Sequence, residues 1–79
     1  MKIHQPARKH GISDEDPIYA ATWTLWINDI DEDNPFRQFR LGFDTRGRLQ
    51  ELVVLVFDSG NELIIHSVKA RPEAIDLLP

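Results

Sequence analysis

The stretch that decides the fold is LQELVVLVFDSGNELIIHSVK, residues Leu49–Lys69. It contains two apolar runs rich in β-branched residues, Leu52–Phe57 and Leu63–Val68, which the tetrapeptide DSGN (residues 58–61) separates. A short polar segment with Gly beside Asn is typical of the turn of a β-hairpin. Each run is apolar at consecutive positions instead of alternating, as expected for strands that are covered on both faces. We therefore predict that this hairpin forms the centre of a sheet.

The length of the hairpin loop determines which side chains share a face. A two-residue loop would pair Val53 with His66, and this places His66 diagonally adjacent to Glu51 on one face. Lys69 would then lie on the opposite face, beside Gln50. A three-residue loop would invert the arrangement, because a shift of one residue turns every side chain to the other face.

The segments before the hairpin predict two helices. The first would begin near Pro6 and end before Gly11, a residue that suits the position just past a helix C-terminus. The second would begin at Ser13 or at Asp16, where acidic residues favour the first helical turn, and it would end before Leu25.

The remaining segments predict two strands and a third helix. Trp23–Ile27 is rich in aromatic and β-branched residues, which favours an edge strand, and Asn28–Pro35 is a polar connection. Phe36–Phe43 alternates between apolar and polar residues as a half-buried strand does, and Asp44–Arg48 predicts a turn. Arg71–Pro79 predicts a short C-terminal helix. The order α, α, β, β, β, β, α predicts an α+β fold, with a four-stranded, mainly antiparallel sheet in one domain over residues 1–79.

Length, charge and composition narrow the class of protein. A chain of 79 residues with no cysteine predicts one small domain without disulfides or thiolate metal sites, in a reducing, cytoplasmic compartment. The N-terminus lacks the apolar core of a signal peptide, and the longest apolar run, Leu52–Phe57, is too short to span a bilayer. The net charge of −4 argues against sequence-independent binding of nucleic acid.

The acidic connection has an incomplete resemblance to a calcium-binding loop. Asp29, Asp31 and Asp33 alternate as the first ligands of an EF-hand do. Asn34 replaces the required glycine and Arg40 replaces the bidentate glutamate, so the segment predicts a solvated loop. The three histidines share no spacing typical of zinc ligands: His4, His10 and His66.

His66 allows two interpretations. In the middle of an apolar strand, a histidine is usually a core residue whose polar atoms find a partner, here Glu51. Alternatively, it is a residue in a surface groove that transfers a proton near neutral pH.

Four segments of the chain resemble one known family. They are KHGISDED (residues 9–16), a basic strand that ends in Leu41-Gly42, ELVVLV (residues 51–56) and IIHSVKAR (residues 64–71). Together they resemble the BrnT-like toxins of bacterial type II toxin–antitoxin pairs, within the RelE/ParE-like superfamily. The resemblance implies a small α+β protein that cleaves RNA or arrests translation, acting on RNA or the ribosome. It also implies a ribbon-helix-helix antitoxin as partner, and neither a metal nor a small-molecule cofactor.

The resemblance also implies a set of site residues. Lys9 and His10 match a KHG motif, Arg37 best matches an arginine five residues before a glycine, and Lys69 occupies the arginine of an IISAR-like last strand. Metal-independent cleavage through the ribose 2′-hydroxyl needs groups that move protons and cations that hold phosphate. The candidates for catalysis are Lys9, His10, His66 and Lys69. The candidates for RNA or phosphate binding are Arg37, Arg40 and Arg71.

Two alternatives remain open at the level of the sequence. Pro35 or Phe36 stands where the family has a glutamate, and this departure, with the acidic net charge, favours a non-catalytic member that binds a protein partner. A structural domain without a site is the other alternative. It predicts that the basic residues are scattered over different faces.

Overall fold

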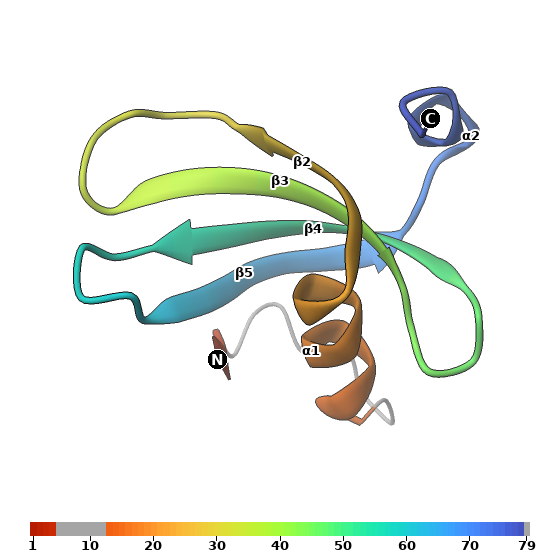
Figure 1. The fold of residues 1–79 in the computed structure, drawn as a ribbon. Helices are drawn as coiled ribbons and strands as arrows, with labels where there is room; N and C mark the ends of the chain where they lie inside the picture. Colours follow the sequence, from red (N-terminus) through yellow and green to blue (C-terminus); the bar gives the residue numbers. More distant parts are fainter. Residues whose placement is uncertain (5–12, 79) are drawn as a thin grey trace.

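In the part of the chain that the structure describes, five strands form one mixed sheet in the order β1-β5-β4-β3-β2, and two short helices accompany it (Figure 1). The computed structural model describes residues 1–4 and 13–78. Its elements are β1 (Lys2–Ile3), α1 (Glu15–Thr22), β2 (Thr24–Asp29), β3 (Phe36–Phe43), β4 (Leu49–Val56), β5 (Glu62–Lys69) and α2 (Pro72–Ile75). The predicted α+β class is confirmed.

The predicted number of four strands is wrong, because β1 adds a fifth. It pairs in parallel with β5, with Lys2 opposite Leu63 and Ile3 opposite Ile64, while the other three pairings are antiparallel. Two residues are too few to show a hydrophobic period, so the sequence carries no local signal for this strand. What holds it is tertiary contact, since Ile3 is buried in the core beside Ile64. The helix predicted near Pro6 lies outside the described residues.

The β4–β5 hairpin lies at the centre of the sheet, as predicted. Its loop holds three residues between Phe57 and Asn61, whose backbone N and O atoms are 3.0 Å apart, and Gly60 adopts a φ of 89° there. A left-handed glycine at the end of a three-residue loop is a common hairpin geometry. Next to this loop, Leu55 therefore pairs with Leu63.

A β-bulge then reverses the effect of the longer loop. The register shifts by one residue between Val53 and Val54, so that Val53 pairs with His66 and Glu51 with Val68. The two one-residue shifts cancel. His66 consequently lies on the same face as Glu51, as the two-residue loop would have placed it.

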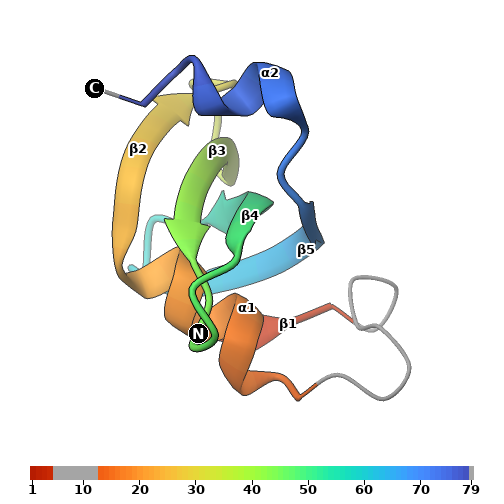
Figure 2. The same cartoon turned by 90° about the vertical axis from the view of Figure 1, so that its right-hand side faces the viewer.

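Helix α1 covers one face of the sheet (Figures 1 and 2). The core beneath it consists of buried side chains from both layers: Ile3, Ala20, Ala21, Leu52, Val54 and Ile64. The helix approaches β3 closely because Gly42 has no side chain. A Cβ atom at Gly42 would lie only 2.1 Å from the carbonyl oxygen of Ala20.

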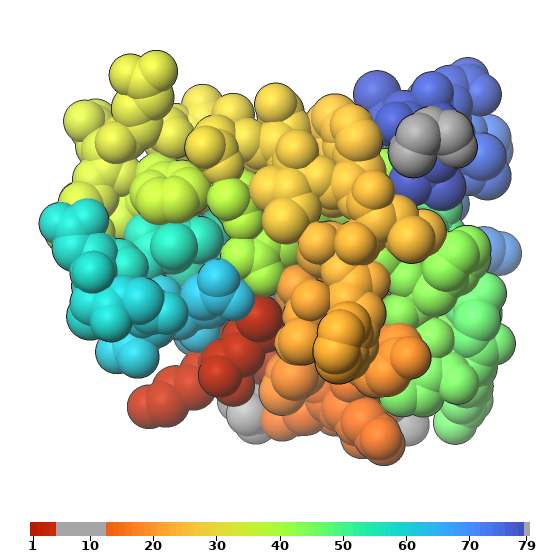
Figure 3. All heavy atoms as spheres, in the orientation of Figure 1, coloured from red at the N-terminus to blue at the C-terminus, as the bar shows by residue number. Residues whose placement is uncertain are grey.

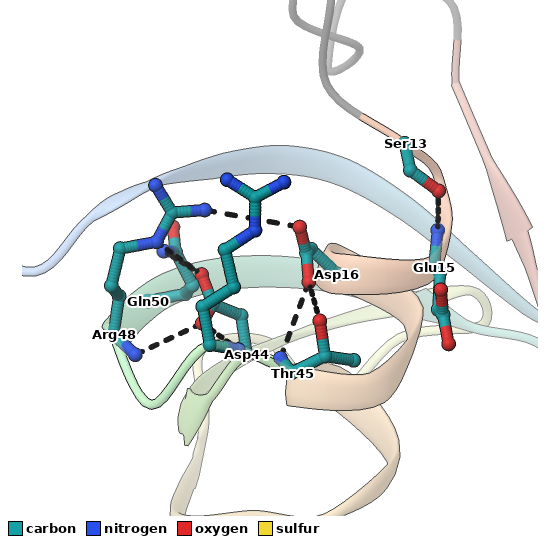
Figure 4. Close-up of polar contacts among 8 residues, drawn as sticks. Ser13, Glu15, Asp16, Asp44, Thr45, Arg48 and Gln50 are labelled. Carbon is teal, nitrogen blue, oxygen red and sulfur yellow. Dashed lines mark hydrogen bonds and ion pairs between the residues drawn. The ribbon is translucent and has the colours of Figure 1, made fainter.

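Polar contacts fasten the first turn of α1 to the β3–β4 turn (Figure 4). The buried carboxylate of Asp16 accepts hydrogen bonds from the backbone N–H and the hydroxyl of Thr45. Asp44, also buried, accepts hydrogen bonds from the backbone N–H and Nε of Arg48, both at 2.9 Å, and from Gln50 at 3.0 Å. These carboxylates have partners within the fold, so they act in stability.

The sheet lies between α1 and α2 (Figure 2). Strand β2 is at the edge, as predicted, and the ring of its Trp26 meets that of Phe39 edge to face at 5.7 Å between centroids. Over residues 1–4 and 13–78, no helix has both the length and the apolar character that crossing a membrane requires.

Candidate functional site

The face of the sheet opposite α1 carries most of the described candidate residues. On β3 and β4, residues whose side chains point away from α1 alternate with the core residues. Strand β5 continues the pattern through the pairing of Val53 with His66. We name this surface the open face and define it by Arg37, Phe39, Leu41, Glu51, Val53, Leu55, Leu63, His66 and Val68.

A buried carboxylate marks one end of the open face. Glu51 is only 3% exposed, and Arg71 binds it through its backbone N–H at 2.6 Å and through Nε and Nη2 at 3.1 Å each. Burial alone would raise the pKa of Glu51, but the hydrogen bonds and charge of Arg71, helped by His66, hold that pKa below its ordinary value. Glu51 is therefore a fixed negative charge at neutral pH.

His66 lies beside this ion pair with an exposed side chain. It is opposite Val53 and diagonally adjacent to Glu51, and its charge contributes to the lowered pKa of that carboxyl. The structure does not make His66 a core residue. An exposed imidazole next to a buried carboxylate is able to exchange protons with a bound molecule.

Arg37 lies on the same face but further away. Its partner on β4 is Leu55, so two strand spacings and two residues separate it from His66, roughly 12 Å between α-carbons. Its Nε and Nη2 bind the two carboxylate oxygens of Asp31 at 2.7 and 3.0 Å, and this hydrogen bonding lowers the pKa of Asp31. The side chain of Arg37 nevertheless remains 50% exposed.

Arg40 and Lys69 are placed on the α1 side of the sheet. Arg40 is buried, and its guanidinium donates to the carbonyl oxygen of Ala21 at 2.8 Å and to the carboxylate of Glu62 at 2.7 and 3.1 Å. Lys69 is exposed and pairs with Gln50, as the two-residue loop would have placed it. Arg40 therefore links α1 to β5, and Lys69 is on the opposite face from His66.

The structure thus brings together three of the predicted site residues and separates two. His66 and Arg37 lie on the open face, and Arg71 binds Glu51 of that face from beyond the end of β5, whereas Arg40 and Lys69 lie on the α1 side. Lys9 and His10 fall within residues 5–12, outside those that the structure describes. Among the described residues, no group of three or more His, Cys, Asp or Glu side chains is arranged to hold a metal ion.

One contact that sequence reasoning missed is the bond between Glu51 and Arg71. The available signal was an acidic residue at the start of the apolar run Leu52–Phe57, because a buried carboxylate needs a cation or several hydrogen-bond donors. That signal indicates the need for a partner. It does not say that the partner lies beyond the end of β5.

The comparisons with known proteins yield no match: neither a family model, nor a curated protein, nor a solved structure is significantly similar to this chain.

Proposed function

We propose that this chain is a toxin-like protein that cleaves RNA or arrests translation through the open face of its sheet. One observation carries the proposal: an exposed imidazole, His66, lies diagonally adjacent to the buried carboxylate of Glu51, which also holds the guanidinium of Arg71. The resemblance to BrnT-like toxins supports the same reading, and it supplies a ribbon-helix-helix antitoxin as the proposed partner.

The chemistry requires one group that moves protons and at least one cation. In the proposed step, His66 takes the proton of a ribose 2′-hydroxyl, whose oxygen attacks the adjacent phosphorus atom. The bond from phosphorus to the 5′-oxygen breaks, the leaving 5′-oxygen takes a proton from water, and protonated His66 returns its proton to the solvent. The products are a 2′,3′-cyclic phosphate and a free 5′-hydroxyl. A cation beside the phosphate stabilises the charge that develops on its oxygens.

Arg71 is the cation best placed for this purpose. Its side chain is 70% exposed, and Glu51 occupies its Nε and Nη2. Its Nη1 makes no hydrogen bond with a described residue and is available to a phosphate oxygen. Glu51 fixes the direction of the guanidinium, so it acts as a positioning residue. Arg37 would hold a second phosphate further along the open face.

The test is protein synthesis in a bacterial translation extract to which the purified chain is added. The parent and the variant Lys69→Gln, which alters the opposite face, should arrest synthesis, whereas His66→Gln and Arg37→Gln should not. RNA recovered from the arrested extract should carry 2′,3′-cyclic phosphate ends. Circular dichroism verifies that every variant is folded. Full arrest by folded His66→Gln would disprove the assigned role of His66.

A second candidate function is a non-catalytic member of the same fold that binds a protein. The observation that favours it is the apolar character of the rest of the open face, where half-buried apolar side chains share the face with His66. These are Phe39, Val53, Leu55 and Leu63. This alternative predicts normal translation in the extract, together with a large rise in melting temperature when the partner is added.

A further inference from the structure

Exposed apolar side chains gather in one part of the chain. Nine large hydrophobic residues are exposed among those described, and five of them lie between residues 19 and 30. These five are Tyr19, Trp23, Leu25, Ile27 and Ile30. Trp23 is the most exposed of them, at 67%, and Leu25 and Ile27 are each 47% exposed. Exposed apolar side chains concentrated within so short a segment indicate a candidate interaction surface.

This surface follows the outer edge of the sheet. Strand β2 is terminal in the strand order and pairs only with β3 among the described strands, and Figure 3 shows its atoms uncovered along that side of the molecule. The edge has few of the features that prevent an edge strand from pairing with another chain. Thr24–Asp29 contains no proline and no basic residue, and its single acid stands at the end. A bulge after Thr24 disturbs only the start of the strand.

The hydrogen bonds to β3 show which backbone groups of β2 point away from β3. The N–H of Ile30 donates to the carbonyl oxygen of Arg37 at 2.8 Å. Bonded and non-bonded pairs alternate along an antiparallel ladder, so Asn28 is also bonded to β3 while Ile27 is not. The N–H and C=O groups of Ile27 therefore point outward from the edge, near the middle of the strand.

We propose that a second copy of this chain pairs with β2 in antiparallel orientation, with Ile27 opposite Ile27 of the second copy. A two-fold axis perpendicular to a continuous sheet pairs residues symmetrically, and a central residue that directs its own backbone groups outward exchanges both of its hydrogen bonds with its copy. Ile27 meets this condition. The two copies would exchange backbone hydrogen bonds there, and the two isoleucine side chains would meet on the α1 side of the joined sheet.

The distribution of charge favours a second copy as the occupant. The acids lie at one end of the strand, at Asp29, and beyond that end, at Asp31–Asp33, and the middle of the edge is uncharged. An antiparallel pairing puts the two acidic ends at opposite ends of the interface, where they do not repel each other. A different partner would need basic residues to match the acidic end. The open faces of both copies would remain uncovered, so the pairing does not depend on the proposed function.

The test uses the absence of cysteine from the chain. Under mild oxidation, Ile27→Cys should form a disulfide-linked dimer, because the two central residues of the pairing are adjacent. Ile75→Cys is the matched control, since Ile75 is 55% exposed but lies on α2, and it should remain monomeric. Analytical ultracentrifugation should show a dimer for the parent and for Ile75→Lys, and a folded monomer for Ile27→Lys.

Three outcomes would overturn the proposal. They are a parent chain that stays monomeric at all concentrations, a dimer that survives Ile27→Lys, and equal cross-linking of the two cysteine variants. If the parent is monomeric alone but binds a basic protein through β2, the edge is an interface for that partner and not for a second copy. The cross-linking result stands independently if Ile27→Lys fails to fold.

Discussion

Arg71 binds the buried carboxylate of Glu51 in two ways, because both the guanidinium group and the backbone N–H of Arg71 donate hydrogen bonds to it. Arg71 lies just beyond the end of β5 and immediately precedes α2, whereas Glu51 lies near the start of β4, the central strand of the sheet. The contact therefore fastens the start of α2 to the sheet. It also fixes the cation that our proposal assigns to phosphate binding.

We expect Arg71→Met to lower stability at neutral pH and to change its dependence on acid. The pKa of Glu51 in the folded protein lies below its ordinary value of 4.5, so this carboxylate contributes stability above that pH. The contribution is lost as the pH falls through the lowered pKa. Without Arg71, nothing offsets the effect of burial, which raises the pKa of Glu51. Stability should therefore fall less steeply as the pH is lowered. Guanidinium-induced unfolding between about pH 3 and pH 7 measures this difference.

The control for this prediction is Lys69→Met, which also removes one positive charge near the end of β5. It should leave the acid dependence unchanged, because Lys69 is on the other face of the sheet. Equal profiles for the parent and Arg71→Met would show that the ion pair does not stabilise the fold.

Gly42→Ala should destabilise the protein strongly. The added methyl group would lie 2.1 Å from the carbonyl oxygen of Ala20, so α1 must move away from β3. Overpacking of this kind costs about 3 kcal/mol. Gly47→Ala is the comparison: nothing lies within 4 Å of its new Cβ, and its φ of 76° alone should cost about 1 kcal/mol. Chemical denaturation measures the free energy of unfolding of both variants. Similar losses of stability for Gly42→Ala and Gly47→Ala would contradict the close approach of α1 to β3.

Substitution by methionine should affect stability differently at the two arginines of β3. Arg40→Met removes a buried cation that bonds both Ala21 and Glu62, and breaking such a pair costs about 3 kcal/mol. Arg37→Met removes an exposed cation and should leave the denaturation midpoint almost unchanged. Only the Arg37 variant is therefore informative in an activity assay. Equal midpoints for the two variants would argue against the buried role of Arg40.

Deletion of Ile65 should remove the β-bulge without changing the pairs on either side of it. Ile64 would stay opposite Val54, and the next residue, His66, would stay opposite Val53. Cross-strand nuclear Overhauser effects between Val53 and His66 should therefore survive in a folded deletion variant. If His66 instead appears opposite Val54, the bulge itself sets the register.

Local sequence patterns predicted the central hairpin, the alternating strand Phe36–Phe43 and the edge position of the segment around Trp26. Each depends on a periodicity or a residue preference that acts over a few neighbouring positions. The same patterns missed β1, which is too short to show a period. They also placed Arg40 in the candidate site, because the polar position of an alternating strand is the same whether it faces solvent or a helix.

The sequence by itself determined that this chain forms a sheet around Leu49–Lys69, since apolar β-branched runs and a glycine turn act locally. The tertiary structure alone decided which side chains share a face. A three-residue loop and a bulge each shift the register by one, and only their combination puts His66 beside Glu51. The tertiary structure also decided that Arg71 binds Glu51 and that Arg40 donates a hydrogen bond to Ala21 of α1. Such pairings join residues distant in sequence, and no local pattern encodes them.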